Sequence, residues 1–408
     1  ASALVAGSVR EPLLRADDIP LDDLRLVAEA VVERVGDRRA TWKRWNLHAE
    51  AVRQTMGLRY ASTADRDAIT GLIVDAAEQA SLRLTPPELA SSPPVFQRGD
   101  GTSVFHPKAS TVYSSEQVLA AEYRLLAASN TRSAPTVSLS LIEQAARSKS
   151  GSGPVLSADQ ERAIAKIGVS GRVLDVLVGP AGTGKTTTMS ALRRAWEKDH
   201  GAGSVVGLAP SAAAADVLAQ DLGISTENTA KWLHEHRRGT WNLTTGQLVI
   251  IDEASLAGTL ALDTLTAHAA DVGAKVLLVG DWAQLAAVDA GGAFGMLVRD
   301  RGDAPELLDV RRFRNDWEKH ASLQLRLGNT DVIDTYLERD RVTPGTYEDI
   351  LDAAYQAWLA DQVAGKTSVL IAETLDTVSE LNTRARTDRI LAGEVALEGV
   401  KLHDGNEA

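Results

Sequence analysis

A glycine-rich loop, GPAGTGKTTT at residues 179–188, is the feature that most constrains how this chain folds. Gly179 and the triplet Gly184-Lys185-Thr186 keep the G-x-x-x-x-G-K-[ST] spacing of a phosphate-binding loop. The apolar run VLDVLVG precedes the loop, and the helical pattern KTTTMSALRRAW follows it. In such a loop the backbone N–H groups point inward, and the following helix adds the positive end of its dipole. Strand, loop and helix together predict a nucleoside triphosphate site.

Each residue type in this loop has a physical reason to be there. Lys185 is expected to reach the β- and γ-phosphates, and the Thr186 hydroxyl is expected to ligate Mg²⁺. A chance match on a glycine-rich loop is the alternative, but the flanking strand and helix argue against it. The predicted nucleotide contacts are Gly179, Pro180, Ala181, Gly182, Thr183, Gly184, Lys185, Thr186 and Thr187.

Two further apolar runs end in polar residues that suit phosphate chemistry. LVIIDEAS places Asp252 and Glu253 at a strand end, where Asp252 is expected to hold Mg²⁺ and Glu253 to orient the attacking water. An acidic pair that merely faces solvent is the alternative. KVLLVGDWAQL ends in Asp281 and Gln284, and a glutamine there is expected to sense the γ-phosphate.

The apolar pattern divides the chain into regions. Residues 1 to about 148 show helical spacing and a predicted hairpin at Asp100-Gly101, and SKSGSGP at 148–154 is typical of a linker. Beyond it, short apolar runs alternate with helical segments, as buried parallel strands require. The last such run is TSVLIAET. We predict an α/β fold with a mainly helical domain at 1–150, a nucleotide-binding domain at 151–305 and a further domain at 306–408.

Composition narrows the function classes. The chain has 408 residues, a net charge of −12 and no cysteine. The absence of cysteine excludes disulfides and Cys-based metal sites, and the acidic balance argues against a protein that coats DNA by charge alone. We therefore expect few phosphate contacts and help from stacking. With no signal peptide and no long apolar run, a cytoplasmic location without membrane contact is expected.

The order and wording of these motifs resemble the superfamily 1 helicases of the RecD-like branch, over roughly residues 154–395. LSADQERAI resembles the adenine-side motif with Gln160 as base reader, and LLDVRRFR resembles motif IV with Arg312 as arginine finger. GLAPSAAAADVL, IIDEAS and VGDWAQLAAVDAGGAF resemble motifs Ia, II and III. VLIAETLDTVSELNTRAR, with Asn382, resembles the opening of a second RecA-like domain.

More narrowly, ATWKRWNLHAEAVRQ and VYSSEQVLAAEYRLL resemble the helicase part of conjugative relaxases of the TraA/TraI/TrwC (MobF) kind. This resemblance implies RecA-like motor domains, ATP and Mg²⁺ as cofactors, 5′-to-3′ movement on single-stranded DNA, and conjugation or relaxosome proteins as partners. The family's nicking domain and its last two motifs are not found, so we expect a piece of a longer protein with a truncated second RecA-like domain.

Contacts with DNA are predicted mainly from motif positions. Pro210, Ser211 and Thr229 match positions whose backbones and hydroxyls touch phosphates in the family. Trp232 suits either base stacking or a core, with the core favoured. Trp42 and Trp45, beside Lys43, Arg44 and Arg53, are either a stacking platform or one buried helix face, with burial favoured. The HEH triplet at 234–236 is interpreted as a solvent-facing helix rather than a metal site.

Two other functions compete with a helicase motor. One is a single-stranded DNA-binding module whose ATPase site is inactive or incomplete, and the other is a different P-loop enzyme such as a small-molecule kinase. The intact Lys185, Asp252, Glu253 and Gln284 argue against degeneration. The helical N-terminal region is expected to pack beside the first motor domain and to guide the strand.

Overall fold

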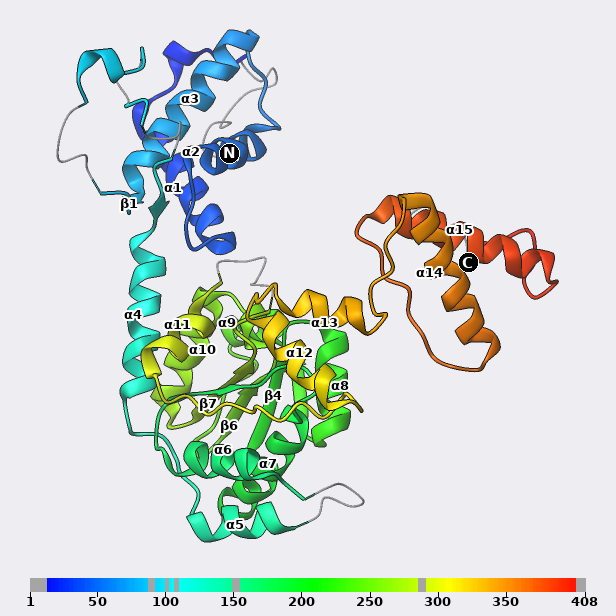
Figure 1. The fold of residues 1–408 in the computed structure, drawn as a ribbon. Helices are drawn as coiled ribbons and strands as arrows, with labels where there is room; N and C mark the ends of the chain where they lie inside the picture. Colours follow the sequence, from blue (N-terminus) through cyan, green and yellow to red (C-terminus); the bar gives the residue numbers. More distant parts are fainter. Residues whose placement is uncertain are drawn as a thin grey trace. The chain divides into compact units, whose positions relative to one another are not determined.

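A five-stranded parallel sheet forms the core of the nucleotide-binding region in this computed structural model (Figure 1). The structure describes residues 13–86, 92–99, 103–105, 110–148, 155–284 and 291–400. The strands follow the order β3-β7-β6-β4-β5, and every neighbouring pair is parallel. Their bounds are β3 (Leu174–Val178), β4 (Val205–Ala209), β5 (Ser225–Asn228), β6 (Leu248–Ile251) and β7 (Lys275–Gly280).

Alternate residues of these strands face two separate cores, as expected for a sheet buried on both faces. On β7, for example, Leu277 and Val279 pack in one core, whereas Val276 and Leu278 pack in the other. The first core includes side chains of α5 (Leu139–Arg147), α6 (Ala158–Val169), α7 (Lys185–His200) and α8 (Ala212–Leu222). The second includes α4 (Glu116–Asn130), α9 (Thr229–Arg237), α10 (Thr259–Val272), α11 (Ala293–Arg301) and the 3-10 turn η4 (Ala254–Leu256). The predicted α/β P-loop fold is confirmed.

The N-terminal region is mainly helical, as predicted. Its first three helices share one apolar core, in which Val31, Leu47 and Ile69 are fully buried. A short antiparallel pair of strands follows the helices. The predicted hairpin turn at Asp100-Gly101 and linker residues 149–154 lie outside the described residues. The elements are η2 (Ala16–Asp18), α1 (Leu21–Arg38), α2 (Arg44–Thr55), α3 (Thr63–Ala80), β1 (Leu82–Arg83), η3 (Pro94–Phe96) and β2 (Tyr113–Ser114).

By its internal contacts the chain divides into two units, Ala1–His320 and Ala321–Ala408. The second unit holds α13 (Val332–Glu338), α14 (Tyr347–Val363) and α15 (Leu375–Leu391), and α12 (Asp316–Arg326) spans the division. The strand predicted in TSVLIAET is not formed: Val369 is 80% exposed and Ile371 is 85% exposed. A strand needs a hydrogen-bonded neighbour, and the described part of this unit contains none. The second RecA-like domain and the three domain boundaries stay predictions.

Among the described helices, none combines the length and the apolar character that crossing a bilayer requires.

Candidate nucleotide-binding and hydrolysis site

The phosphate-binding loop leaves the end of β3 in a conformation that needs glycine. Gly182 and Gly184 adopt left-handed φ angles of 82° and 80°, which side chains with a Cβ rarely adopt. The Gly179 N–H donates to the Gly280 carbonyl at 2.9 Å, so the loop begins directly beside the end of β7. The Thr183 hydroxyl donates to the Pro180 carbonyl at 2.8 Å and braces the turn from within. The sequence motif thus forms the loop that it predicts.

Lys185 begins helix α7, and its ammonium group faces the end of β6. Its Nζ lies 3.5 Å from Oε1 of Glu253, and the two side chains are only partly exposed. Thr186 and Thr187 follow in the first turn and are half-buried, whereas Ala181 and Gly182 are exposed. The charge expected to meet a phosphate is therefore paired with the residue expected to orient water.

Asp252 occupies the end of β6, where its backbone N–H donates to the Leu208 carbonyl at 3.0 Å. Its Oδ1 is buried and has no hydrogen-bond partner among the described residues. Burial raises the pKa of Asp252 above its ordinary value, and the neighbouring Glu253 raises it further. A buried carboxylate oxygen without a partner costs free energy, so this geometry suits a carboxylate that binds a cation.

The residues fit a magnesium ion that is bound together with phosphates. In the described part of the chain, no group of three or more His, Cys, Asp or Glu could hold a metal by itself. Mg²⁺ commonly takes one or two protein oxygens and completes its shell with substrate phosphates and water. The Asp252 carboxylate and the Thr186 hydroxyl are the two oxygens that we predict for this role.

Glu253 adopts a left-handed backbone conformation with φ 49°. For a residue with a side chain this conformation costs about 1 kcal/mol. Such strained residues are concentrated at functional sites. Here the conformation accompanies the abrupt change from β6 to η4 and the approach of the Glu253 carboxylate to Lys185.

Gln284 lies just beyond the end of β7, which pairs with both β3 and β6. Its Nε2 donates to Oδ2 of Asp281 at 3.3 Å, and its backbone N–H donates to the Asp281 carbonyl at 3.2 Å. Asp281 is 2% exposed, so the glutamine is held by a buried carboxylate whose role the sequence had left unassigned. The rest of that motif, residues 285–290, lies outside the described residues.

Gln160 is fully buried against the phosphate-binding loop. Its Nε2 donates to the carbonyls of Thr183 at 3.2 Å and Gly184 at 3.3 Å, while its Oε1 accepts from the Ser157 N–H at 3.0 Å. The amide thus braces the loop here. Its role as adenine reader stays a prediction, and it requires these bonds to rearrange.

Arg312 lies against the same loop. A Cβ placed on Gly182 would approach Cβ, Cγ and Cδ of Arg312 to 2.8 Å, so only glycine permits this contact. The Arg311 N–H donates to the Gly182 carbonyl at 2.8 Å. The guanidinium carbon of Arg312 lies 4.7 Å from the ring centre of Phe313. The arginine predicted as a finger is therefore beside the phosphate-binding loop, and its catalytic role stays a prediction.

Comparison with known proteins agrees with this geometry. Residues 155–347 match the family described as AAA domain. The chain is 34% identical over 255 residues to "Probable conjugal transfer protein TraA" of Sinorhizobium fredii, covering 62% of this chain and 23% of that protein. It is 39% identical over 132 residues to "ATP-dependent RecD2 DNA helicase" of Deinococcus radiodurans, covering 30% of this chain and 17% of that protein. The chain is therefore similar to a RecD-like helicase over part of its length.

Two further similar proteins are a second TraA protein and a helicase of known structure. "Conjugal transfer protein TraA" of Rhizobium radiobacter is 34% identical over 243 residues, covering 59% of this chain and 22% of that protein. A solved structure, "Crystal structure of Pif1 helicase from Candida albicans", aligns with a TM-score of 0.40 and 18% identity, covering 60% of this chain and 56% of that one. The chain spans less than a quarter of the length of the TraA relatives.

The sheet places the predicted DNA-contacting hydroxyls at the ends of β4 and β5. Ser211 is exposed at the start of α8, and its Oγ accepts from the Ala214 N–H at 3.1 Å. Thr229 is 8% exposed, and its hydroxyl donates to the Ala209 carbonyl at 3.0 Å. The Pro210 carbonyl accepts from the Asn228 amide at 3.3 Å. Ser211 is thus the most accessible of the three, and their contacts with DNA stay predictions.

Trp232 belongs to the second core of the sheet. It is 1% exposed, and its ring stacks on His236 with centroids 4.9 Å apart. His236 also contacts His268, with centroids 4.3 Å apart. The favoured core role of Trp232 is therefore confirmed, and the base-stacking alternative is wrong. The solvent-facing interpretation of HEH holds for the exposed His234 but is wrong for His236, because the helix turns that ring onto Trp232.

Trp42 and Trp45 separate in the structure. Trp42 is 2% exposed, and its indole N–H donates to the Ser81 hydroxyl at 3.1 Å. Trp45 is 58% exposed, and the guanidinium carbon of Arg39 lies 5.7 Å from its ring centre. Shared burial was the favoured interpretation, and it is wrong for Trp45. The chain enters α2 between the two residues, so Trp42 faces the helical core and Trp45 does not.

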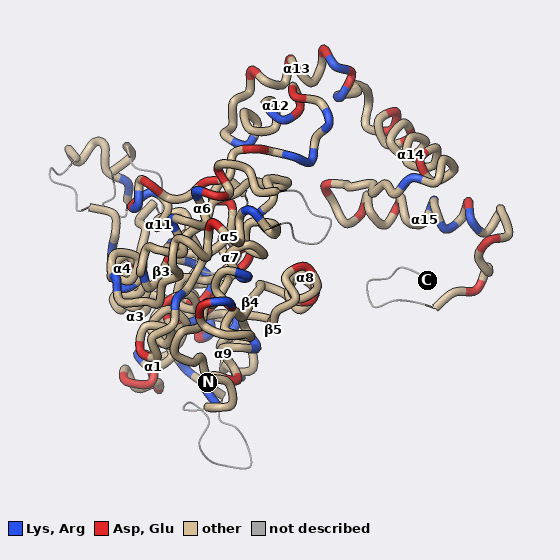
Figure 2. Tube along the Cα trace, turned by 90° about the horizontal axis from the view of Figure 1, so that it is seen from below, with Lys and Arg blue, Asp and Glu red and all other residues tan. Residues whose placement is uncertain are grey.

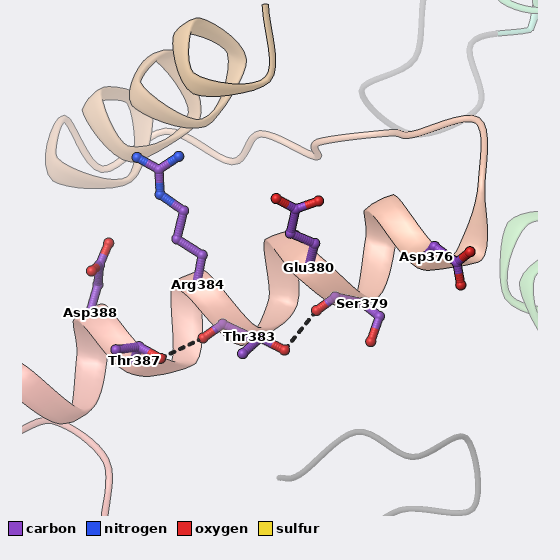
Figure 3. Close-up of a pocket in the computed structure, with 7 residues that line it drawn as sticks. All are labelled: Asp376, Ser379, Glu380, Thr383, Arg384, Thr387 and Asp388. Atoms are coloured by element: carbon purple, nitrogen blue, oxygen red, sulfur yellow. Dashed lines mark hydrogen bonds between the residues drawn. The ribbon is translucent and has the colours of Figure 1, made fainter. Parts of the chain in front are cut away.

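One shallow pocket lies in the second unit, along α15 (Figure 3). Arg384 projects from this helix and pairs with Asp352 at 2.6 Å. The Thr387 hydroxyl donates to the Thr383 carbonyl, within the helix itself. The pocket contains no residue that the sequence predicts for a site, and one helix supplies all of its lining residues: Asp376, Ser379, Glu380, Thr383, Arg384, Thr387 and Asp388.

Proposed function

We propose that this chain is an ATP-dependent DNA motor, the helicase part of a conjugative relaxase, which moves along single-stranded DNA. The observation that carries the proposal is the pairing of Lys185, at the start of α7, with Glu253. The adjacent Asp252 has a buried oxygen without a partner in the described part of the chain. Similarity to proteins described as conjugal transfer proteins supports the setting in plasmid transfer. Relaxosome proteins are the expected partners.

Hydrolysis would begin with an exchange of partners at Lys185. When the triphosphate enters, the Lys185 ammonium leaves Glu253 for the β- and γ-phosphates, where it offsets negative charge. The freed Glu253 carboxylate then orients the attacking water. Asp252 and Thr186 would hold Mg²⁺, which neutralises charge on the phosphates. Arg312, already beside Gly182, would contact the transferred group, and Gln284 would report its loss.

Movement on DNA would use the strand ends next to this site. Ser211 and Thr229 follow β4 and β5, so a shift at the nucleotide reaches them through one rigid sheet. Basic and acidic residues are interspersed along the chain (Figure 2). This distribution agrees with DNA binding that relies on few phosphate contacts. Movement from 5′ to 3′ is proposed on family resemblance.

The decisive experiment measures ATP turnover by the purified chain with and without single-stranded DNA, beside Lys185→Ala. We expect DNA to stimulate turnover, and the variant to lose at least about 10²-fold in kcat because a phosphate-stabilising charge is gone. Tight DNA binding without turnover would instead support the DNA-holding module. The control is a chain extended to the length of the TraA relatives. It tests whether ATP turnover requires additional segments.

The N-terminal helices are proposed to guide the strand through Trp45. Its exposed ring offers a face to a base beside the cation of Arg39, and stacking contributes about 1–3 kcal/mol per base. Trp45→Ala should weaken single-stranded DNA binding about tenfold, as measured by fluorescence anisotropy. Met56→Ala removes another exposed apolar side chain, at the C-cap of the same helix, and is the matched control. Equal affinities of Trp45→Ala and the native chain would refute this role.

A further inference from the structure

Residues 305–312, which we name the strap, run along β3 and the phosphate-binding loop. The Val178 N–H donates to the Pro305 carbonyl at 2.9 Å, and the Leu307 N–H donates to the Val178 carbonyl at 2.8 Å. Leu307 is fully buried in the core beside α6 and α7. The strap then reaches Gly182 through the Arg311 N–H and brings Arg312 onto the loop. Its path therefore decides where the Arg312 guanidinium starts.

One carboxylate, that of Asp159, joins the strap to the first turn of α6. Its Oδ2 accepts from the backbone N–H groups of Leu308 at 3.1 Å and Asp309 at 3.5 Å. Its Oδ1 accepts from the Gln160 N–H at 3.0 Å and from the Ser157 hydroxyl. Oδ1 therefore bonds with groups at the start of α6, and Oδ2 bonds with the strap.

The ionised form of Asp159 is favoured where it lies. Burial by itself would raise its pKa, but hydrogen bonds from Ser157 and from the N–H groups of Leu308 and Gln160 outweigh it, so the pKa lies below its ordinary value. Hydrogen bonds to an ionised acceptor are roughly twice as strong as those between neutral groups. A charged tether of this kind holds a backbone segment more firmly than a neutral one.

We propose that Asp159 is a positioning residue that fixes the strap and thereby places Arg312 over the phosphate-binding loop. The proposal deepens the motor function and rests on it for the catalytic role of Arg312. Arg312 is four residues beyond Leu308, and one residue of chain spans about 3.5 Å. A strap released at Leu308 and Asp309 keeps its backbone bonds at Leu307 and Arg311, but the segment between them can shift and move the guanidinium by about 1 Å. A displacement of about 1 Å can cost about 100-fold in rate.

A role confined to capping α6 is the competing explanation, and the variants are chosen to separate the two. Asp159→Ala removes both functions of the carboxylate, whereas Asp159→Asn keeps one acceptor oxygen. Glu161→Ala is the matched control, because Glu161 is exposed on the same helix and carries the same charge. Arg312→Ala, alone and combined with Asp159→Ala, tests whether the tether acts through the arginine.

The first measurement is amide hydrogen exchange in the full chain, which does not depend on turnover. In Asp159→Ala we expect the Leu308 and Asp309 amides to exchange about tenfold faster, with little change in Glu161→Ala. Unchanged exchange across the strap would overturn the proposal. This result stands even if the chain hydrolyses no ATP, so failure of the tether and failure of the motor function are distinguishable.

The second measurement is ATP turnover. Asp159→Ala should lower kcat about tenfold and change KM for ATP less than about twofold, with Asp159→Asn between it and the native chain. In the Arg312→Ala background the same substitution should add almost nothing, because the residue through which it acts is already missing. Losses that multiply independently in the double variant would show that Asp159 does not act through Arg312.

Discussion

At the amino ends of β3 and β7 a buried Asp175 contacts both Lys275 and Arg301. At the carboxyl end of β6, by contrast, the half-buried Asp252 has a buried oxygen that finds no partner among the described residues. Both carboxylates belong to the same sheet and are separated only by the length of its strands. Lys275 donates to Asp175 at 3.0 Å, to Ser170 at 2.8 Å and to the Arg172 carbonyl at 2.9 Å, although burial lowers its pKa. All three donors of the Lys275 ammonium are therefore used.

The difference shows how one sheet separates stability from function. Charges at the amino end are satisfied by the protein itself, so that end has little to offer a ligand. At the carboxyl end, the Oδ1 atom of Asp252 has no hydrogen-bond partner among the described residues, and Glu253 has a strained backbone conformation. Polar groups without partners lower the stability of the free protein and gain partners when a ligand binds. Active sites commonly combine lower stability with function in this way.

The largest expected effect comes from breaking the amino end. Asp175→Ala leaves Lys275 and Arg301 buried without their carboxylate, and we expect a loss of about 4 kcal/mol in unfolding free energy, measured by urea denaturation. Asp303→Ala is the matched control, since it removes an exposed partner of the same Arg301 and should cost less than about 1 kcal/mol. Similar losses for the two variants would contradict the contrast between the ends of the sheet.

At the carboxyl end the expected effect falls on rate rather than stability. Glu253→Gln keeps the size of the side chain but cannot accept a proton, so kcat for ATP should fall about 100-fold. Unfolding free energy should change by less than about 1 kcal/mol, because the Lys185 pair is partly exposed. Steady-state kinetics and urea denaturation on the same preparation test both parts. A variant that unfolds easily but retains its kcat would reverse the assignment.

Asp252→Asn should move stability in the opposite direction from Asp175→Ala. The substitution removes the charge of a carboxylate whose buried Oδ1 has no partner among the described residues, so the unfolding free energy of the nucleotide-free protein should rise by about 1 kcal/mol. Mg²⁺-dependent nucleotide binding, measured by calorimetry, should weaken in the same variant. A loss of stability in Asp252→Asn would show that the carboxylate already has a stabilising partner.

The smallest expected effect is a dependence on pH. Because the pKa of Asp252 is higher in the folded than in the unfolded chain, the folded state binds this proton more tightly. The stability gain of Asp252→Asn should therefore shrink as pH falls through the raised pKa towards the ordinary value of about 3.9. Melting temperatures of the native chain and the variant, compared from neutral to acid pH, test this. A gain that stays constant over this range would mean that Asp252 does not titrate there.

The local chemistry of the nucleotide site could be predicted from the sequence because each part of it is continuous. The loop from Gly179 to Thr186 is one uninterrupted segment, and Asp252 and Glu253 directly follow an apolar strand. The ends of buried parallel strands meet at one edge of the sheet, so these parts were bound to converge. The contacts of Asp159 with Leu308 and of Asp175 with Lys275 had no such signal, since these partners lie 100 or more positions away in the chain.

Burial of individual aromatic residues was less predictable. Trp42 and Trp45 have the spacing of one helix face, yet α2 begins at Arg44, so the helical rule did not apply to both. His236 has polar neighbours in the chain but packs on Trp232 and His268. The exposed Val369 and Ile371 form an apolar run of the kind typical of strands, but a strand also requires a partner.

The sequence by itself determined the α/β class, the phosphate-binding loop and the carboxylates expected beside it, because these depend on local spacing and on the rule that parallel strands end together. Only the tertiary structure decided which charges are satisfied. Asp175 and Asp252 both adjoin apolar runs and look alike in sequence. Asp175 nevertheless contacts two cations, whereas Asp252 has an oxygen without a hydrogen-bond partner among the described residues. That difference depends on side chains from distant elements, since the energy of a buried charge is set by what surrounds it in space.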